Sequence, residues 1–410
     1  MTSGFASIPA STRRSVLLLS FATFSSMTAQ RLCDAMLPEL SREFSVSLAQ
    51  AAQVVSWFAV VYGLAQLFYG PLGDRLGKYR IVTLATLGCS LGSIAAVFAA
   101  SLDWLVAARV LTSLGAAAII PLSLAWIGDA VAYERRQETL ARVGLGTTLG
   151  IACGQLLGGV FTDTLGWRWA FGFMTLLFGG VGLLLLADLR RQQTRPVPRH
   201  DAALEIADGA RPGFVRQALS IVTGRWSRVV LGVALVEGAV GFGVMAIWAS
   251  HLHHALGLSL SVSGGIVALF GLGGMLYMAV ARFLIRRLGE RGLVRVGVGL
   301  LAGCALVLAY TPHWAPTVPA SLLAGFGFFM FHNTMQLNAT QMAPATRGTA
   351  VSLFASSLFL GQSIGVLLAA ALVGWLGSAA VIAGGALCLL VAGYVFAHAL
   401  QQRDRLLGAV

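Results

Sequence analysis

The sequence Gly70-Pro71-Leu72-Gly73-Asp74-Arg75-Leu76-Gly77-Lys78-Tyr79-Arg80 lies between two long apolar stretches, residues 47–70 and 79–101. Glycine allows tight turns and close approach of neighbouring helices. An acidic side chain is stabilised where a helix N-terminus presents free N–H groups and the positive end of its dipole. The spacing therefore predicts a short turn between two membrane-spanning helices, built from Gly70, Gly73, Asp74, Arg75, Gly77, Lys78 and Arg80.

The rest of the chain has the composition of a protein that lies mostly in lipid. Of its 410 residues, 57% are hydrophobic and 11% are charged, and the mean hydropathy is +0.81, whereas soluble domains carry about 25% charged residues. A spanning helix needs roughly 20 apolar residues. We therefore expect an all-α membrane protein with twelve transmembrane helices, the first of them uncleaved. The apolar stretches cover residues 15–38, 47–70, 79–101, 104–127, 141–163, 168–188, 228–250, 261–283, 292–311, 316–341, 348–372 and 376–399.

A gap in the apolar pattern divides the chain. Residues 189–227 are rich in arginine, contain Pro196, Pro198 and Pro212, and carry few apolar residues. This composition is typical of a linker, with a short surface helix near residues 213–222. We expect a six-helix bundle at residues 1–188, a cytoplasmic linker at residues 189–227 and a second six-helix bundle at residues 228–410.

Two pairs of segments indicate that the halves are related. The segment Asp74-Arg75-Leu76-Gly77-Lys78 matches Arg286-Arg287-Leu288-Gly289-Glu290, and Gly154-Gln155-Leu156-Leu157-Gly158 matches Gly361-Gln362-Ser363-Ile364-Gly365. Both pairs are separated by nearly the same number of residues, as expected for a duplicated six-helix unit. In transporters built in this way, the substrate site lies at the interface between the halves.

The basic residues predict the orientation in the membrane. The net charge of +12 comes from bases scattered between apolar runs, which argues against nucleic-acid binding. If both termini lie in the cytoplasm, nearly all of the 28 Lys and Arg residues face inward, as the positive-inside rule requires. We expect a multi-pass protein of the inner membrane with cytoplasmic N- and C-termini. The exceptions are Arg31, Arg42, Arg109 and Arg168.

Residues 70–80 resemble the signature between the second and third helices of the major facilitator superfamily, and the chain is similar to its twelve-helix drug:proton antiporters. The resemblance implies that Asp74 caps the start of the eleventh helix, after Pro344, when the cytoplasmic side is closed. Asp129, at the inner end of the fourth helix, is the expected partner for the bases of the turn. The alternative is that these bases only orient the turn. The resemblance also implies a monomer.

The fifth span carries glycines at regular intervals. Glycines four residues apart line one helix face and allow close packing of two backbones. The pattern resembles the antiporter signature of exporters in this superfamily, although the family commonly has a proline where Gln155 stands. A general small-residue packing face is the alternative. The residues concerned are Gly146, Gly150, Gly154, Gln155, Gly158 and Gly159.

The first span contains a carboxylate beside a base, and charged residues within spans are costly and usually functional. Gln30 and Asp34 lie four residues apart and share a helix face, next to Arg31. Asp34, followed four residues later by Pro38, resembles the first helix of drug:proton antiporters. Removal from water favours the protonated form of a carboxyl group, so we expect Asp34 to exchange a proton as substrate binds or leaves. A permanent ion pair with Arg31 or Arg109 is the alternative.

Two further charged residues fall within spans. Arg109 lies in the fourth span and Glu237 lies midway along the seventh. The family resemblance implies that Arg109 transfers protons or holds a nearby carboxylate, and outward snorkelling is the alternative. Glu237 is the second candidate for proton coupling or for holding a cationic substrate. A hydrogen bond between helices, made while Glu237 is protonated, is the alternative.

The tenth span is unusually polar. Asn333, Gln336 and Thr340 fall on one helix face, and we expect them to line a central cavity, unless they only form hydrogen bonds between helices. The other candidates for this cavity are Gln30, Phe58, Tyr62 and Trp248, although aromatic side chains in spans face lipid more often.

These features together predict a proton-coupled secondary transporter that exports small amphiphilic or cationic compounds by alternating access. Its partners would be a small-molecule substrate, protons and the lipid bilayer. The alternatives are efflux or uptake of a sugar or other metabolite, and a non-transporting membrane sensor or scaffold. The sequence shows no nucleophile–base set and no metal-ligand spacing, and Leu72 replaces the first glycine that a phosphate loop needs before Gly77-Lys78. We therefore expect neither an enzyme nor a bound cofactor.

Overall fold

The computed structural model describes residues 9–193 and 214–408, and these residues form helices joined by short turns. The N-terminal half contains α2 (Ala10–Arg31), the 3-10 turn η1 (Asp34–Met36), α3 (Leu37–Glu43), α4 (Leu48–Ala51), α5 (Gln53–Leu76), α6 (Lys78–Val97), α7 (Leu102–Ala130), α8 (Tyr133–Thr164) and α9 (Trp167–Gln193). The C-terminal half contains α10 (Phe214–Thr223), α11 (Arg225–Val236), the π-helical segment η3 (Glu237–Gly243), α12 (Trp248–Leu256), α13 (Leu260–Tyr310), α14 (Thr317–Gln341), the 3-10 turn η4 (Pro344–Thr346), α15 (Arg347–Leu376) and α16 (Ser378–Gly408).

The all-α architecture with twelve passes is confirmed. Within the described residues, nine helical segments are long and apolar enough to cross a membrane, and the more polar α2 and α14 add two. The 51-residue α13 leaves helical geometry at Gly289. Both of its ends lie beside α12, because α13 follows α12 closely in the chain and His251 of α12 contacts the Leu308 carbonyl. The chain therefore reverses at Gly289, and α13 makes two passes.

Several helices are longer than their apolar stretches. The predicted loop at residues 70–80 is mostly helix, because α5 continues through Pro71 to Leu76 and α6 starts at Lys78. Gly77 alone makes the turn, with a φ of 91°, which glycine adopts at little cost. Hydropathy locates the part of a helix that lies in lipid, whereas the polar turns at its ends carry no such signal.

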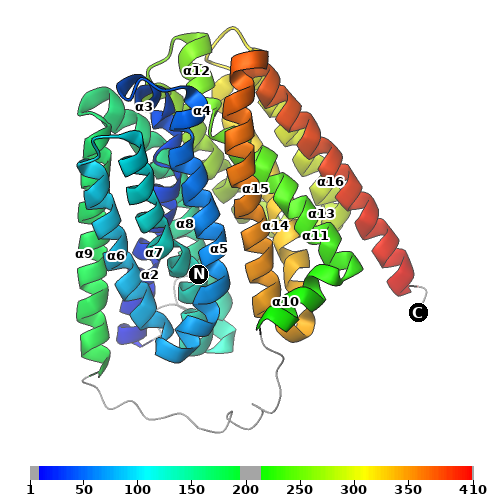
Figure 1. The fold of residues 1–410 in the computed structure, drawn as a ribbon. Coiled ribbons are helices and arrows are strands. Elements are labelled where there is room, and N and C mark those ends of the chain that lie inside the picture. The colour runs from blue at the N-terminus through cyan, green and yellow to red at the C-terminus, as the bar shows by residue number, and fades with distance from the viewer. Residues whose placement is uncertain (1–8, 194–213, 409–410) are drawn as a thin grey trace.

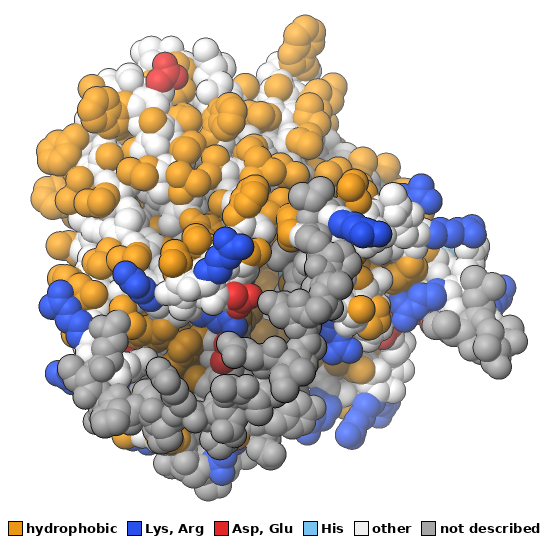
Figure 2. Space-filling model, turned by 60° about the horizontal axis from the view of Figure 1, so that its bottom comes forward, with side chains coloured by type: hydrophobic (Ala, Val, Ile, Leu, Met, Phe, Trp, Pro, Cys, Tyr) orange, Lys and Arg blue, Asp and Glu red, His pale blue; other side chains and the backbone are white. Residues whose placement is uncertain are grey.

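The two ends of the molecule differ in charge. One end, here called the basic end, carries the α5–α6 turn, the last turn of α9 and the Gly289 turn, whose bases include Lys78, Arg190 and Arg286. Figure 2 shows Lys and Arg side chains gathered on this side of the molecule. The other end, here called the α12 end, carries α3, α4 and α12 (Figure 1). The expected short helix near residues 213–222 is α10, which lies at the basic end (Figure 1).

The two halves pack against each other through two helix pairs. α5 lies beside α15 (Figure 1). α8 lies beside the first part of α13. Ser56 Oγ lies 2.6 Å from Ser363 Oγ, and a Cβ atom added at Gly63 would lie 2.9 Å from Cβ of Phe359. These close contacts involve the parts of α5 and α15 that lie toward the α12 end.

The glycine faces of the two halves pack in the same way. In the N-terminal half, Gly154 of α8 lies against the carbonyl oxygen of Thr28 in α2. In the C-terminal half, Gly361 of α15 lies against the carbonyl oxygen of Leu235 in α11. The turn glycine of the other repeated segment, Gly289, has a positive φ of 63°, as Gly77 does. The repeat that the sequence predicts therefore has a counterpart in three dimensions.

Candidate functional site

The first pass is interrupted at the level of its carboxylate. α2 ends at Arg31, a 3-10 turn follows at Asp34–Met36, and α3 begins at Leu37. Pro38 lies in the first turn of α3, where a missing backbone N–H costs nothing. Asp34 thus stands at a break between two helices, and its side chain is fully buried.

Asp34 binds two partners within the N-terminal half. Its Oδ2 accepts a hydrogen bond from Gln155 Nε2 at 2.8 Å and lies 3.4 Å from Arg31 Nη1. Its Oδ1 is buried and has no hydrogen-bond partner among the described residues. Because buried polar atoms are nearly always paired, Oδ1 can accept a proton or a hydrogen bond from water. Gln155 Oε1 is likewise buried without a described partner and can also accept a hydrogen bond from water.

Gln155, which stands where the family commonly has a proline, therefore contacts Asp34, the candidate proton carrier. Gln155 lies on α8, and its neighbours Gly154 and Gly158 bring that helix against the backbone of α2. This approach allows the Gln155 amide, which is 1% exposed, to reach Asp34. A proline at this position would have no side-chain donor.

The glycines of α8 allow close packing on two sides of the helix. Gly146 and Gly150 pack against the backbone carbonyls of Ser20 and Phe24 in α2, as the small-residue packing predicts. Gly159 points the other way and lies against the Leu260 carbonyl of α13. α8 is thus in close contact with its own half and with the opposite half.

Arg109 is buried, with 1% exposure, so the snorkelling alternative is wrong. Its Nη1 donates to the Ala29 carbonyl at 2.7 Å, its Nε donates to the Val54 carbonyl at 3.4 Å, and its guanidinium lies 4.0 Å from the centre of the Phe58 ring. The partners described for Arg109 are therefore two backbones and a ring. In this conformation Arg109 joins α2 and α5 to α7.

A second acid–base pair lies in the C-terminal half. Glu237 is the first residue of the π-helical segment η3 and has no exposed surface. Its Oε1 lies 2.8 Å from Nδ1 of His332, on α14. Sequence reasoning noted the polar character of α14 but did not join His332 to Glu237. The period of a regular helix cannot place a residue that begins a π-helical segment.

One aromatic side chain lies between the two acid–base pairs. The Arg31 guanidinium lies 4.3 Å from the centre of the Phe242 ring. The ring centroids of Phe242 and His332 are 6.3 Å apart. The charged cluster of the N-terminal half therefore meets that of the C-terminal half through Phe242.

Two of the predicted cavity residues, Gln30 and Tyr62, contact the opposite half, and a third, Phe58, packs beside Tyr62. Gln30 donates to Gln362 across the interface at 3.5 Å. Tyr62 packs on Phe359 with centroids 4.5 Å apart, and Phe58 stacks on Tyr62. All three are buried in this conformation.

The other predicted cavity residues lie elsewhere. Trp248 lines a small apolar pocket within the C-terminal half, together with Phe270 and Phe328. On α14, Asn333 is half-buried, Gln336 is exposed, and Thr340 donates to a carbonyl of its own helix. The structure therefore does not bring the α14 face together with Gln30 and Tyr62.

The turn at the basic end forms an ion-pair cluster. Lys78 Nζ lies 2.6 Å from Asp129 and 3.3 Å from Asp74. Asp129 is thus a partner for one base of the turn, whereas Arg75 and Arg80 are exposed. Asp74 is also 68% exposed, and its described partner is Lys78 rather than the start of α15.

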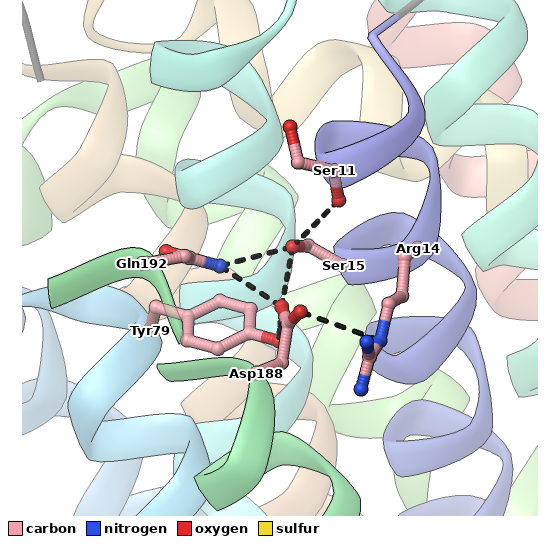
Figure 3. Close-up of polar contacts among 6 residues, drawn as sticks. All are labelled: Ser11, Arg14, Ser15, Tyr79, Asp188 and Gln192. Atoms are coloured by element: carbon pink, nitrogen blue, oxygen red, sulfur yellow. Dashed lines mark hydrogen bonds and ion pairs between the residues drawn. The ribbon is translucent and has the colours of Figure 1, made fainter. Parts of the chain in front are cut away.

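A buried carboxylate near the end of α9 was missed. Asp188, 4% exposed, accepts hydrogen bonds from Ser15 at 2.7 Å, Tyr79 at 2.8 Å and Gln192 at 2.9 Å, and pairs with Arg14 at 3.4 Å (Figure 3). These donors come from α2, α6 and α9. Asp188 falls at the end of an apolar run, where hydropathy gives no indication of burial.

A second missed acid joins the halves at the α12 end. Asp163 is near the end of α8, and its carboxylate accepts hydrogen bonds from the backbone N–H of Leu260 at 3.3 Å and of Ser261 at 2.6 Å. These are the first residues of α13, in the other half. A carboxylate from one half therefore caps a helix of the other.

Comparison with known proteins identifies the family. The family model described as the Major Facilitator Superfamily matches residues 19–366. The chain belongs to this superfamily. The superfamily consists of membrane-spanning transporters, so the chain has the fold of a transporter rather than of an enzyme.

Curated relatives match part of the chain. Citrate exporter 1 of Aspergillus niger is 29% identical over 182 residues, which cover 44% of this chain and 34% of that protein. Multidrug export protein EmrB of Escherichia coli is 27% identical over 191 residues, covering 47% and 37%. Methyl viologen resistance protein SmvA of Salmonella typhimurium is 30% identical over 213 residues, covering 49% and 42%. The chain spans less than half the length of these relatives.

Solved structures share the fold over nearly the whole chain. An inward-facing, unoccupied bacterial homologue of the human lysosomal transporter Spinster has a TM-score of 0.70 at 19% identity, covering 95% of this chain and 96% of that chain. The nucleoside transporter NupG has a TM-score of 0.71 at 13% identity, covering 95% and 98%. At these identities the likeness concerns the fold alone.

Proposed function

We propose that this transporter exports small amphiphilic or cationic compounds in exchange for protons. Two six-helix bundles, residues 1–188 and 228–410, would rock about their interface, with residues 189–227 as the linker. The basic end would face the cytoplasm of a bacterial inner membrane, because bases collect on that side. The curated relatives EmrB and SmvA, a multidrug export protein and a methyl viologen resistance protein, support this substrate class.

Asp34 is the observation that carries the proposal. It is fully buried in a span, has one carboxylate oxygen without a partner among the described residues, and lies beside Arg31, which packs on Phe242 of the opposite half. A carboxyl group that changes protonation there changes the charge at the meeting point of the halves. Its Coulomb interaction with Arg31 is strong because little water screens it. Proton binding at Asp34 can therefore alter how the two halves fit together.

The contacts between the halves support an inward-facing conformation. Ser56, Gln30 and Asp163 each contact the C-terminal half toward the α12 end. Asp74 is exposed at the basic end. In the opposite conformation the basic end would close, and Asp74 would cap the first turn of α15 as the family resemblance implies. Alternating access would then exchange one helix cap, Asp163 on α13, for another, Asp74 on α15.

Arg109 and Glu237 complete the proposed proton-coupling set. Arg109 holds the backbones of α2 and α5 on either side of the charged cluster, so it maintains the position of Asp34. Glu237 supplies a second buried carboxylate on the other side of Phe242. Asn333, Gln336 and Thr340 remain the proposed lining of a cavity that opens toward the basic end.

Export of an anionic metabolite is the second candidate. The N-terminal half buries two guanidinium groups, Arg31 and Arg109, with one carboxylate, Asp34, close to them. A net positive charge in a region of low dielectric attracts anions and repels cations. Citrate exporter 1, a relative at 29% identity, supports this candidate.

A susceptibility and efflux panel in cells that lack their own pumps separates the two candidates. We expect the protein to lower accumulation of ethidium and methyl viologen, and a protonophore to abolish this effect. Asp34→Asn should abolish it too, whereas the control Asp103→Asn, an exposed acid in the first turn of α7, should not. Export of citrate without export of either cation would favour the second candidate.

A further inference from the structure

In the pair formed by Glu237 and His332, one side chain is fully buried and the other is partly exposed. Glu237 has no exposed side-chain surface, whereas the His332 side chain is 14% exposed. Oε1 of Glu237 lies 2.8 Å from His332 Nδ1, and Oε2 is buried without a described protein partner. A proton that enters from water must therefore reach Glu237 through a neighbour, and His332 has both the hydrogen bond and the exposed surface.

Aromatic rings surround His332 on several sides. His332 stacks on Phe328 with centroids 5.5 Å apart and an angle of 11°. The rings of Phe242, Phe329 and Phe354 lie 6.3, 6.2 and 6.1 Å away. Apolar rings of this kind limit the access of water to the bond between Glu237 and His332, which leaves the exposed part of His332 as the described route to Glu237.

The backbone next to the pair is also unusual. Glu237 begins the π-helical segment Glu237–Gly243, which also carries Phe242. π-helical segments within helices often occur at functional sites. A change in the charge of Glu237 would therefore act on the same segment that contacts Arg31 through Phe242.

We propose that His332 is the proton-exchange residue of the C-terminal half and that it carries protons between water in the space toward the basic end and Glu237. Nε2 of His332 takes a proton from water, and the proton on Nδ1 passes to Oε1 of Glu237. The products are a neutral imidazole and a neutral carboxylic acid, so one proton has moved from water to Glu237. The reverse sequence releases it. Histidine suits this role because its unperturbed charge change falls between about pH 5 and 8.

Other titratable groups near the pair belong to neighbouring helices. Arg31 of α2 lies across the Phe242 ring, and Tyr277 of α13 interacts with Asn333, the residue after His332. Arg31 already pairs with Asp34, which lies on the other side of Phe242. The Glu237–His332 pair is therefore a separate proton site, and its link to export rests on the function proposed above.

Time-resolved infrared spectroscopy on the purified full-length protein tests the relay without a transport substrate. A jump from about pH 8 to about pH 5 should produce a protonated-carboxyl band that Glu237→Gln removes. We expect His332→Gln to slow the appearance of this band at least tenfold. His398→Gln, at an exposed histidine that pairs with Gln402, should leave it unchanged.

Chemical rescue separates a relay from a structural role. In His332→Ala, free imidazole in the buffer should restore the rate of the band, because it can occupy the vacated site and transfer protons. A wild-type rate in His332→Gln, or no Glu237 band in the wild-type protein, would overturn the proposal. A normal relay in a protein that shows no proton-driven export would overturn the proposed function alone.

Discussion

Nε2 of Gln155 donates a hydrogen bond to Oδ2 of Asp34 over 2.8 Å, between two side chains that are both buried. Asp34 therefore has a neutral donor on α8 in addition to Arg31 on α2. Hydrogen bonds to charged groups contribute about 1.5–3 kcal/mol. The bond favours the ionised form of Asp34 and joins the glycine face of α8 to the proposed proton carrier.

Replacing Gln155 by Leu should change how export depends on pH. Loss of the donor makes the ionised carboxylate less stable, so Asp34 should retain its proton to higher pH, and the pH profile of export should move to more alkaline values. The matched control is Gln362→Leu, at the equivalent position of α15, where the partner is the neutral Gln30. Initial efflux rates across a pH series provide the measurement. Equal profiles for the two variants would contradict this assignment.

The close approach of α8 to α2 makes Gly158 intolerant of a side chain. A Cβ atom there would collide with the Leu32 carbonyl oxygen, and overpacking typically costs about 1–3 kcal/mol. We expect Gly158→Ala to lower the melting temperature of the purified protein by several degrees. Gly144→Ala, on the same helix with open space around it, should leave the melting temperature unchanged or raise it. A harmless Gly158→Ala would show that the helices are further apart.

The cap of α13 by Asp163 should bias the protein toward closure at the α12 end. Removing a helix cap by substitution with alanine costs about 0.5–2 kcal/mol, so Asp163→Ala should raise the population that is open there by about 2- to 30-fold. A cysteine placed at Ser363, which is buried against Ser56, reports this opening through its rate of alkylation. Asp103→Ala is the control, and an unchanged alkylation rate in Asp163→Ala would contradict the capping role.

The carboxylate of Asp188 should contribute to stability rather than to transport. Its removal leaves the Tyr79 and Ser15 hydroxyls with fewer partners (Figure 3), and unsatisfied buried groups cost about 1–3 kcal/mol each. We expect Asp188→Ala to lower the melting temperature by several degrees, and Tyr79→Phe to produce a smaller decrease. The pH profile of export should remain unchanged in both variants. A shifted profile would place Asp188 in the proton pathway.

The sequence was sufficient for the number of passes, because a continuous stretch of about 20 apolar residues is long enough to cross a bilayer as one helix. It also predicted Asp34, Arg109 and Glu237 as buried charges, because such residues in apolar runs are rarely accidental. It could not identify their partners. Gln155 reaches Asp34, and His332 reaches Glu237, through contacts between helices that are distant in the chain.

The residues that sequence reasoning missed share a position near helix ends. Asp163 and Asp188 lie at or close to the ends of their apolar runs, where charged residues are common and usually solvated. Their roles depend on tertiary contacts. Asp163 caps α13 of the other half, and Asp188 accepts hydrogen bonds from side chains of three helices. Trp248 shows the reverse error, because its aromatic character suggested a substrate cavity but it lines a pocket within its own half.

The central claim is that Asp34 carries the proton that drives export. The most direct measurement is proton flux in proteoliposomes that hold purified protein and ethidium, under an imposed pH gradient. Wild-type protein should move ethidium against its concentration gradient and dissipate the pH gradient as it does so. Asp34→Asn should still exchange ethidium down its gradient but should move no protons. Proton-driven ethidium transport at the wild-type rate in Asp34→Asn would contradict the claim.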